Sequence, residues 1–158
     1  MAPQTPTSVA YDVPTARAYA RAGRLEEWIH AYLAAGTWAN VGLSQGLARQ
    51  RRWWNGPLEL PLDCLTPCVG PSPDMEYVVE PVAWDARTRA MAEGFGDPLA
   101  IPPLIAEYRA GVLSVRDGNT RHAAFRVKGW GTCWAIIWYN TEEDYLAHTE
   151  ELRERRLA

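Results

Sequence analysis

The sequence contains only three cysteines, Cys64, Cys68 and Cys133, which are too few and of the wrong parity for a disulfide-bonded scaffold. No apolar run approaches the ~18 residues that a membrane-spanning helix needs. The first residues, MAPQTPTSVAYDVP, lack the basic and apolar regions of a signal peptide. These absences predict a cytoplasmic protein with reduced thiols and no membrane partner.

The overall charge is weakly acidic, with a formal net value of −3, so the molecule as a whole does not attract nucleic acid. One short basic stretch, ARQRRWW over residues 48–54, places Arg49, Arg51 and Arg52 beside Trp53 and Trp54. Such a mixture can bind a nucleic-acid backbone and stack on bases. It can equally be a solvated helix face whose tryptophans enter the core, which the shortness of the stretch and the acidic net charge favour.

Length and composition predict one domain with a sizeable core, since the chain is 47% hydrophobic and has eight tryptophans. Helical periodicity runs from Pro14 to Gly36, and further helices are predicted over 41–54, 82–95 and 141–156. The first helical region carries an apolar stripe, made of Leu25, Trp28, Ile29, Tyr32 and Leu33. We predict that residues 1–57 form an arm and a helical extension, packed on a core of residues 58–158.

Four segments have the pattern of β-strands. Residues 58–65 contain Pro61, which restricts this strand to the edge of a sheet. Residues 102–109 and 112–117 flank Ala110-Gly111 and predict a hairpin. Residues 132–140, TCWAIIWYN, are apolar on both faces, which is typical of a central strand. Together with the helices, these strands predict an α/β (α+β) fold with a small mixed sheet.

A polar turn joins the 112–117 strand to a helix predicted from about Asn119 to Gly129. Gly118 permits a tight turn that a side chain would obstruct, and Asn119 is a natural N-cap. The free N–H groups at the helix start and the guanidinium of Arg121 suit a phosphate. Asp117 beside them would hold a metal ion or orient Arg121. The alternative is ordinary capping chemistry, with Asp117 and Arg121 forming a structural ion pair.

The segment LSVRDGNTRHAAFRVKGWGTCWAIIW resembles the signature of the ParB/sulfiredoxin-like fold. In that family a strand enters an Asp-Gly-Asn-His-Arg or Gly-Glu-Arg-Arg type of turn, followed by a helix, a glycine and an apolar strand. PPLIAEYRAGVL is similar to the hairpin before that turn, and LELPLDCLTP is similar to the opening strand. The resemblance covers residues 58–140 and implies a stand-alone member with an N-terminal helical extension.

Members of this family bind nucleotide phosphates at the turn, and they include CTP- and DNA-binding partitioning proteins, ADP-using free-serine kinases and ATP-using sulfiredoxins. The resemblance therefore implies a nucleotide site for ATP, ADP or CTP with Mg²⁺, in which Asp117 positions the metal or the accepting hydroxyl. The implied phosphate site consists of Asp117, Gly118, Asn119, Thr120, Arg121 and His122. The implied function is a phosphotransferase or nucleotide hydrolase that acts on an unidentified small-molecule acceptor. The alternative is a non-catalytic nucleotide-sensing or DNA-associated module.

The chain also departs from the family. Thr120 stands where many members have histidine, and the turn has no cysteine, which argues against sulfiredoxin activity. Pro67-Cys68-Val69 has no acid where the serine kinases carry a catalytic glutamate, so Glu76 and Glu80 are the candidates for that role. One helix is predicted after Asn140, which does not provide the helix-turn-helix domain of partitioning proteins and makes nucleic acid the lesser alternative.

We also predict the surroundings of three side chains outside the turn. Arg87 and Arg89 would reach the phosphate if the helix over 82–95 packs across the turn, and a solvated face is the alternative. His148 lies among acidic residues on the last helix and is predicted to face solvent.

Overall fold

The computed structural model describes residues 10–35 and 39–157. Its α-helices are α1 (Val13–Arg21), α2 (Leu25–Ala34), α3 (Val41–Leu47), α4 (Pro81–Gly94), α5 (Asn119–Lys128) and α6 (Glu142–Glu154). Its strands are β1 (Trp53–Pro61), β2 (Leu65–Pro67), β3 (Val69–Gly70), β4 (Tyr77–Val78), β5 (Leu104–Arg109), β6 (Val112–Asp117) and β7 (Thr132–Tyr139). Short 3₁₀ helices occupy Leu62–Cys64 and Pro98–Ala100. Most of the arm predicted over 1–13, and the stop predicted at Gly36, lie outside the described residues.

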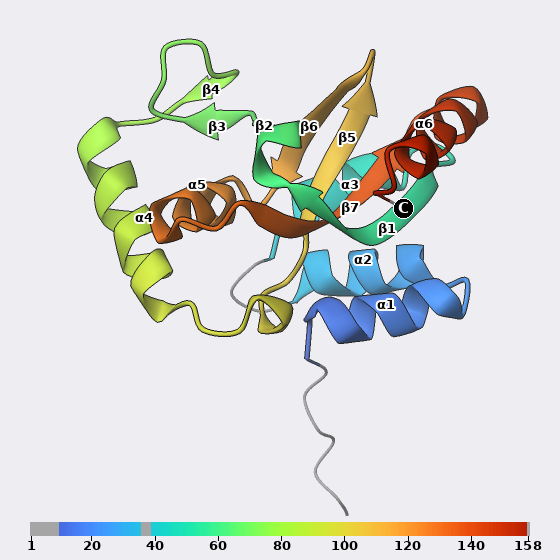
Figure 1. The fold of residues 1–158 in the computed structure, drawn as a ribbon, viewed down its shortest axis with the longest axis horizontal. Coiled ribbons are helices and arrows are strands. Elements are labelled where there is room, and N and C mark those ends of the chain that lie inside the picture. Colours follow the sequence, from blue (N-terminus) through green and yellow to red (C-terminus); the bar gives the residue numbers. More distant parts are fainter. Residues whose placement is uncertain (1–9, 36–38, 158) are drawn as a thin grey trace, which may run out of the picture.

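Five strands form one mixed sheet in the order β1-β7-β5-β6-β2, and β3 pairs with β4 separately. The hairpin β5–β6 is antiparallel, whereas β5 and β7 run parallel. Helices α1 and α2 lie on one side of the sheet, and α4 packs along α5 on the other (Figure 1). The prediction of an α/β (α+β) fold with a small mixed sheet is confirmed. No helix within the described ranges is both long and apolar enough to cross a membrane.

Strand β7 is apolar along most of its length because both of its faces are buried. Ala135, Ile137 and Tyr139 join one core cluster, which also contains residues of α5 and α6. Ile136 and Trp138 join a second cluster, built mainly from α2 and its neighbours. Successive side chains of a strand point to opposite faces, so a strand covered on both sides needs apolar residues at every position. The prediction of a central strand here is confirmed.

The basic stretch at 48–54 does not continue the preceding helix. Helix α3 ends at Leu47, and Trp53 and Trp54 belong to β1, where they pair with Tyr139 and Trp138. Trp53 packs against the first core cluster and Trp54 against the second, because neighbouring residues of a strand face opposite sides. The helix predicted over 41–54 was therefore too long, but the prediction that its tryptophans enter the core is confirmed.

Strand β1 also crosses the boundary predicted between residues 57 and 58. The division of the chain into two parts at that point stays a prediction. The strand predicted over 58–65 is broken by the 3₁₀ turn at Leu62–Cys64 into the end of β1 and the start of β2. Both β1 and β2 are edge strands, as the proline in this stretch requires. The N-terminal helical region is likewise two helices, since Gly23 between them has a φ of 73°.

The prediction that His148 faces solvent is wrong. Its side chain is 6% exposed, and its Nδ1 lies 2.6 Å from the Tyr139 hydroxyl. Its ring stacks on Tyr108 with a centroid separation of 4.4 Å. Periodicity could place His148 on the acidic helix α6 but could not show that this face of the helix rests on the sheet. Burial lowers the pKa of His148, and burial also lowers the pKa of His122.

Because the pKa values of these two histidines are lowered in the folded protein, we predict that the protein loses stability in mild acid. A histidine whose pKa is lower in the folded state than its ordinary value of 6.5 takes up a proton more readily when the chain unfolds. We expect the free energy of unfolding to be retained above pH ~6.5 and to fall as the pH is lowered towards ~5. Urea denaturation across this range measures the slope. In His148→Gln, which keeps a hydrogen-bonding group but does not titrate, the slope should be shallower, and an unchanged slope would contradict the assignment.

Candidate functional site

A cavity of about 370 Å³ lies between α4, one face of α5 and the segment after β2, and we call it the α5 cavity. It is lined by Pro67, Val69, Gly70, Pro71, Met75, Trp84, Asp85, Thr88, Asn119, His122, Ala123, Arg126 and Val127. Most of these side chains are apolar, and the polar ones belong to the helices α4 and α5. The cavity therefore lies between α4 and the helix that follows the predicted phosphate turn.

The turn into α5 has the conformation that the sequence predicted for Gly118. This residue is the N-cap of α5 with a φ of 98°, a left-handed conformation that favours glycine. A Cβ here would lie 2.4 Å from Leu104 Cδ2 and 2.7 Å from Arg121 Nη2. Asn119 is thus the first residue of the helix and not its N-cap. The N–H groups of Asn119 and Thr120 donate to no acceptor within the described ranges, which leaves this helix start able to bind an anion.

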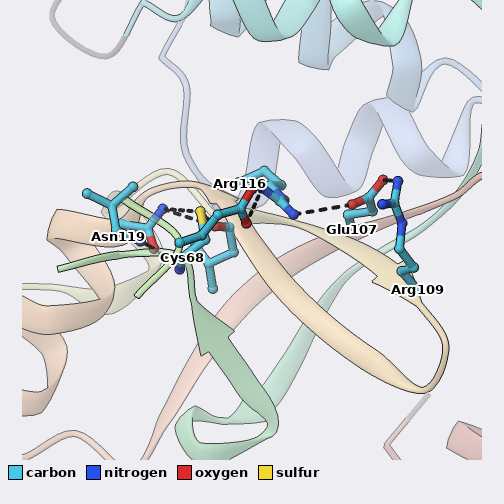
Figure 2. Close-up of polar contacts among 8 residues, drawn as sticks. Cys68, Glu107, Arg109, Arg116 and Asn119 are labelled. Carbon is cyan, nitrogen blue, oxygen red and sulfur yellow. Dashed lines mark hydrogen bonds and ion pairs between the residues drawn. The ribbon is translucent and has the colours of Figure 1, made fainter. Parts of the chain in front are cut away.

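Asn119 uses its side chain to hold one wall of the cavity. Its Oδ1 accepts hydrogen bonds from the backbone N–H groups of Cys68 at 2.8 Å and Val69 at 3.2 Å. Its Nδ2 donates to the carbonyl of Val115 at 3.0 Å and lies 3.5 Å from Cys68 Sγ (Figure 2). The amide therefore ties the loop after β2 to the end of β6, although Cys68 and Asn119 are 51 residues apart.

Asp117 and Arg121 form a buried ion pair, which is the alternative that the sequence left open for them. Arg121 is 1% exposed, and its Nη2 lies 2.7 Å from Asp117 Oδ2. Its Nη1 donates to the carbonyl of Pro102 at 2.8 Å, and its guanidinium lies over the ring of Tyr32. Neither Asp117 nor Arg121 lines the α5 cavity. The predicted phosphate-binding role of Arg121 therefore has no support in the position of its side chain.

The surroundings of Asp117 do not fit a magnesium ion. Its Oδ2 accepts hydrogen bonds from both Arg121 and, at 3.2 Å, the hydroxyl of Tyr32. Burial raises the pKa of Tyr32, so this hydroxyl keeps its proton and remains a donor. Across residues 10–35 and 39–157 there is no group of three or more His, Cys, Asp and Glu side chains that could hold a metal ion. Mg²⁺ favours carboxylates that are open to the ion and to water, and Asp117 is not.

His122 is the second predicted site residue that reaches the α5 cavity. It is 2% exposed, and its Nε2 lies 3.3 Å from the carbonyl of Leu62. The lowered pKa of His122 makes a neutral imidazole the dominant form near neutral pH. Thr120 is half-buried in the first turn and is not part of the lining. Of the six residues predicted at the turn, the structure brings Asn119 and His122 to the wall of the cavity.

The two glutamates considered for catalysis have other partners. Glu76 Oε2 lies 3.0 Å from Arg116 Nη1. Glu80 is the N-cap of α4 and accepts from the N–H groups of Ala83 at 2.7 Å and Val82 at 2.9 Å. These backbone hydrogen bonds lower the pKa of Glu80. Neither glutamate lines the α5 cavity.

The polar groups of the α4 side were not predicted individually. Trp84 and Thr88 face α5, and periodicity had placed them on a common face without showing what that face covers. Arg87 lies over the ring of Trp84, and Arg89 is paired with Asp85 at 2.9 Å. Helix α4 packs along α5, and Arg87 and Arg89 are not among the residues that line the cavity.

Arg126 is the cation that the α5 cavity does contain, and sequence reasoning did not select it. It lies on α5, one helical turn after His122, and its side chain is 59% exposed. Its partner is Asp63, which is 87% exposed, with Nη2 and Oδ1 separated by 3.2 Å. An exposed ion pair of this kind contributes little to stability, so an incoming anion can replace Asp63.

No protein-family model matches the chain, and no curated protein matches it. Among solved structures, the chain is similar to the C-terminally truncated chromosome-partitioning protein ParB from Caulobacter crescentus complexed with CTP-gamma-S. The match covers 66% of this chain and 55% of that chain, with 16% sequence identity and a TM-score of 0.39. The chain thus spans about half the length of that structure, and its fold is distantly similar.

Proposed function

We propose that this chain binds a nucleotide in the α5 cavity and acts through binding rather than through phosphoryl transfer. The observation that carries the proposal is the meeting of two features at Asn119. Its backbone N–H belongs to a helix start with unused donors, and its side chain lies in the wall of a cavity of about 370 Å³. That volume lies within the range of ~300–1,000 Å³ that is usual for small-molecule sites.

The lining of the cavity offers the two kinds of surface that a nucleotide needs. The start of α5 supplies N–H groups and the positive end of a helix dipole, and Arg126 in the last turn of the same helix supplies a full charge; both kinds of group suit phosphate oxygens. Trp84, Met75 and Val69 supply apolar surface, against which a base can be buried. The neutral His122 can donate or accept one hydrogen bond without adding charge.

Binding is proposed in place of transfer because the acids needed for chemistry lie elsewhere. Asp117 is buried in its ion pair, Glu76 is bonded to Arg116, and Glu80 caps α4. Among the lining residues Asp85 is the carboxylate, and Arg89 holds it at 2.9 Å. A phosphotransferase needs a base that accepts the proton of the acceptor hydroxyl. Asp85 is therefore the residue on which the phosphotransferase alternative depends.

Calorimetric titration with ATP, ADP and CTP, each with and without Mg²⁺, tests the proposal. We expect saturable binding of one or more of them, and we expect Arg126→Gln to weaken it about 10-fold, by ~1.4 kcal/mol, through the loss of a charge-assisted hydrogen bond. Arg153→Gln removes another exposed arginine, on α6, and should leave the affinity unchanged. If wild-type protein binds no nucleotide at millimolar concentration, or if both variants bind like wild type, the α5 cavity is not a nucleotide site.

Two further measurements separate the alternatives. Phosphate release from bound ATP should not exceed the background, and release that disappears in Asp85→Asn would establish an enzyme instead. Affinity for a DNA duplex that falls steeply with salt would favour the DNA-associated module, because neutralised phosphates release their counterions on binding. Nucleotide binding to the α5 cavity should depend on salt much less.

A further inference from the structure

A second cavity, which the proposed function does not use, lies between α3 and the ends of β5 and β7. We call it the α3 cavity; its volume is about 620 Å³, and it shares no lining residue with the α5 cavity. Its wall contains two arginines, Arg52 and Arg109, of which Arg52 comes from the basic stretch ARQRRWW. The proposed function leaves both arginines unexplained.

Glu107 provides the first argument, because its negative charge is already neutralised. This β5 residue is 6% exposed, and its Oε2 accepts from Arg109 Nη2 at 3.2 Å and from Asn140 Nδ2 at 3.1 Å. Its Oε1 lies 3.6 Å from Arg116 Nη2, so the carboxylate sits between two guanidinium groups (Figure 2). A buried carboxylate with three donors around it does not call for a cationic ligand.

Arg52 provides a fixed positive charge in the same lining. Its Nε donates to the carbonyl of Leu47 at 3.3 Å, and its Nη2 donates to the carbonyl of Gly46 at 3.0 Å. Its Nη1 donates to Asn140 Oδ1, and the same asparagine donates to Glu107. Arg52 thus joins the C-terminal end of α3 to the end of β7, and it forms no ion pair with a carboxylate of residues 10–35 or 39–157.

Two further side chains of this wall, Trp138 and Arg109, carry hydrogen-bond donors. Trp138 is 4% exposed, and its indole N–H donates to no acceptor within residues 10–35 and 39–157. This nitrogen has almost no solvent-accessible surface, so it is the indole ring and not its N–H that lines the cavity. Arg109 uses one of its five N–H groups on Glu107, and its side chain is 72% exposed and able to move. The amide of Gln50 also lies in the lining.

We propose that the α3 cavity binds a small organic oxyanion, a carboxylate or phosphate monoester attached to an apolar body. Arg109 donates to its oxygens, and Arg52 adds positive charge. The apolar body packs against Leu43, Leu47 and the Trp138 ring, which share the lining. Asp144, a half-buried carboxylate of the same wall, disfavours ions of high charge such as nucleoside triphosphates.

Four probes with the same phenyl body separate charge from shape: benzoate, phenyl phosphate, neutral benzamide and cationic benzylammonium. The readout is the ¹H–¹⁵N resonance of the Trp138 indole, which is assigned by its loss in Trp138→Phe. We expect benzoate, phenyl phosphate or both to shift this resonance saturably, with at least a 10-fold preference over benzamide and benzylammonium. Whichever of the two oxyanions binds more tightly identifies the headgroup class.

A matched pair of variants tests the residues. Arg109→Gln keeps a donor to Glu107 but removes the charge, and it should weaken the preferred oxyanion at least 10-fold. Arg153→Gln, on an exposed arginine of α6 outside the cavity, should have no effect. The proposal is overturned if no probe moves the indole resonance saturably at millimolar concentration, if benzamide or benzylammonium binds as tightly as the oxyanions, or if Arg109→Gln binds like wild type. None of these results depends on nucleotide binding to the α5 cavity.

Discussion

Replacement of Arg121 by alanine should lower the free energy of unfolding of the ligand-free protein by about 3–5 kcal/mol. Asp117 would remain 8% exposed with its charge, and the Tyr32 hydroxyl would be its remaining hydrogen-bond donor. The carbonyl of Pro102 would also lose its donor. Removing one partner of a buried ion pair costs far more than the pair itself contributes, because the other charge stays desolvated. Urea denaturation measures the loss directly.

Arg121→Lys and a double variant make this result interpretable. Lysine keeps the charge but cannot bond to both Asp117 and Pro102 as the guanidinium does, so we expect an intermediate loss. Replacing both partners, as Arg121→Met with Asp117→Leu, should recover much of the stability, because no unpaired charge is left buried. A loss below ~1 kcal/mol in Arg121→Ala, typical of an exposed pair, would contradict the buried pairing.

The same variants decide the role of the turn in binding. Because Arg121 does not line the α5 cavity, nucleotide affinity measured on the folded fraction of Arg121→Lys should remain close to that of wild type. If instead affinity falls while stability is kept, Arg121 is a phosphate ligand after all, and the ion pair opens on binding. Calorimetry on folded protein and urea denaturation without ligand together separate these two roles.

Trp28→Ala should cost about 3–5 kcal/mol, the usual range for removing a large aromatic side chain from a core. Trp28 is 1% exposed and stacks on Tyr32 with centroids 5.1 Å apart. Its indole N–H donates to Thr15 Oγ1 at 3.1 Å and so links α2 to α1. Alanine would leave a cavity between the N-terminal helices and the sheet, because this cluster also contains Ile105 and Ile136.

Val82→Ala is the control, since Val82 is 77% exposed and its truncation should change stability by less than ~0.5 kcal/mol. We propose that the N-terminal helices and the rest of the chain unfold as one unit, so Trp28→Ala should shift a single urea transition without changing its slope. Two separated transitions in the variant, or a stability equal to that of wild type, would show that the helices are independent of the sheet.

Local patterns were sufficient wherever one segment decides its own conformation. The β5–β6 hairpin follows from two apolar runs around Ala110-Gly111, and the two-sided apolar pattern of β7 requires cover on both faces. Gly118 has a left-handed φ of 98°, and a side chain there would meet Leu104; the sequence predicted a tight turn that a side chain would obstruct. The apolar stripe of α2, which includes Trp28 and Ile29, is buried as its spacing predicted.

Local patterns were insufficient wherever a side chain chooses between partners from distant segments. Asp117 and Arg121 stand four residues apart, and the sequence allowed them either to bind phosphate or to pair. Tyr32, 85 residues before Asp117, adds a donor to that carboxylate and an aromatic face to the guanidinium, which together bury the pair. His148 was misplaced for the same reason, because Tyr139 and Tyr108 cover it from the sheet.

The sequence by itself therefore determined the order and type of most elements, the tight turn before α5 and the faces that had to be buried. These properties depend on backbone conformation and on periodic contact with water, which neighbouring residues control. Only the tertiary structure decided which polar groups face the cavities: Asn119, His122 and Arg126 in one, and Arg52 and Arg109 in the other. A charge is either paired or left available according to what distant segments bring within hydrogen-bond distance, and no local pattern contains that information.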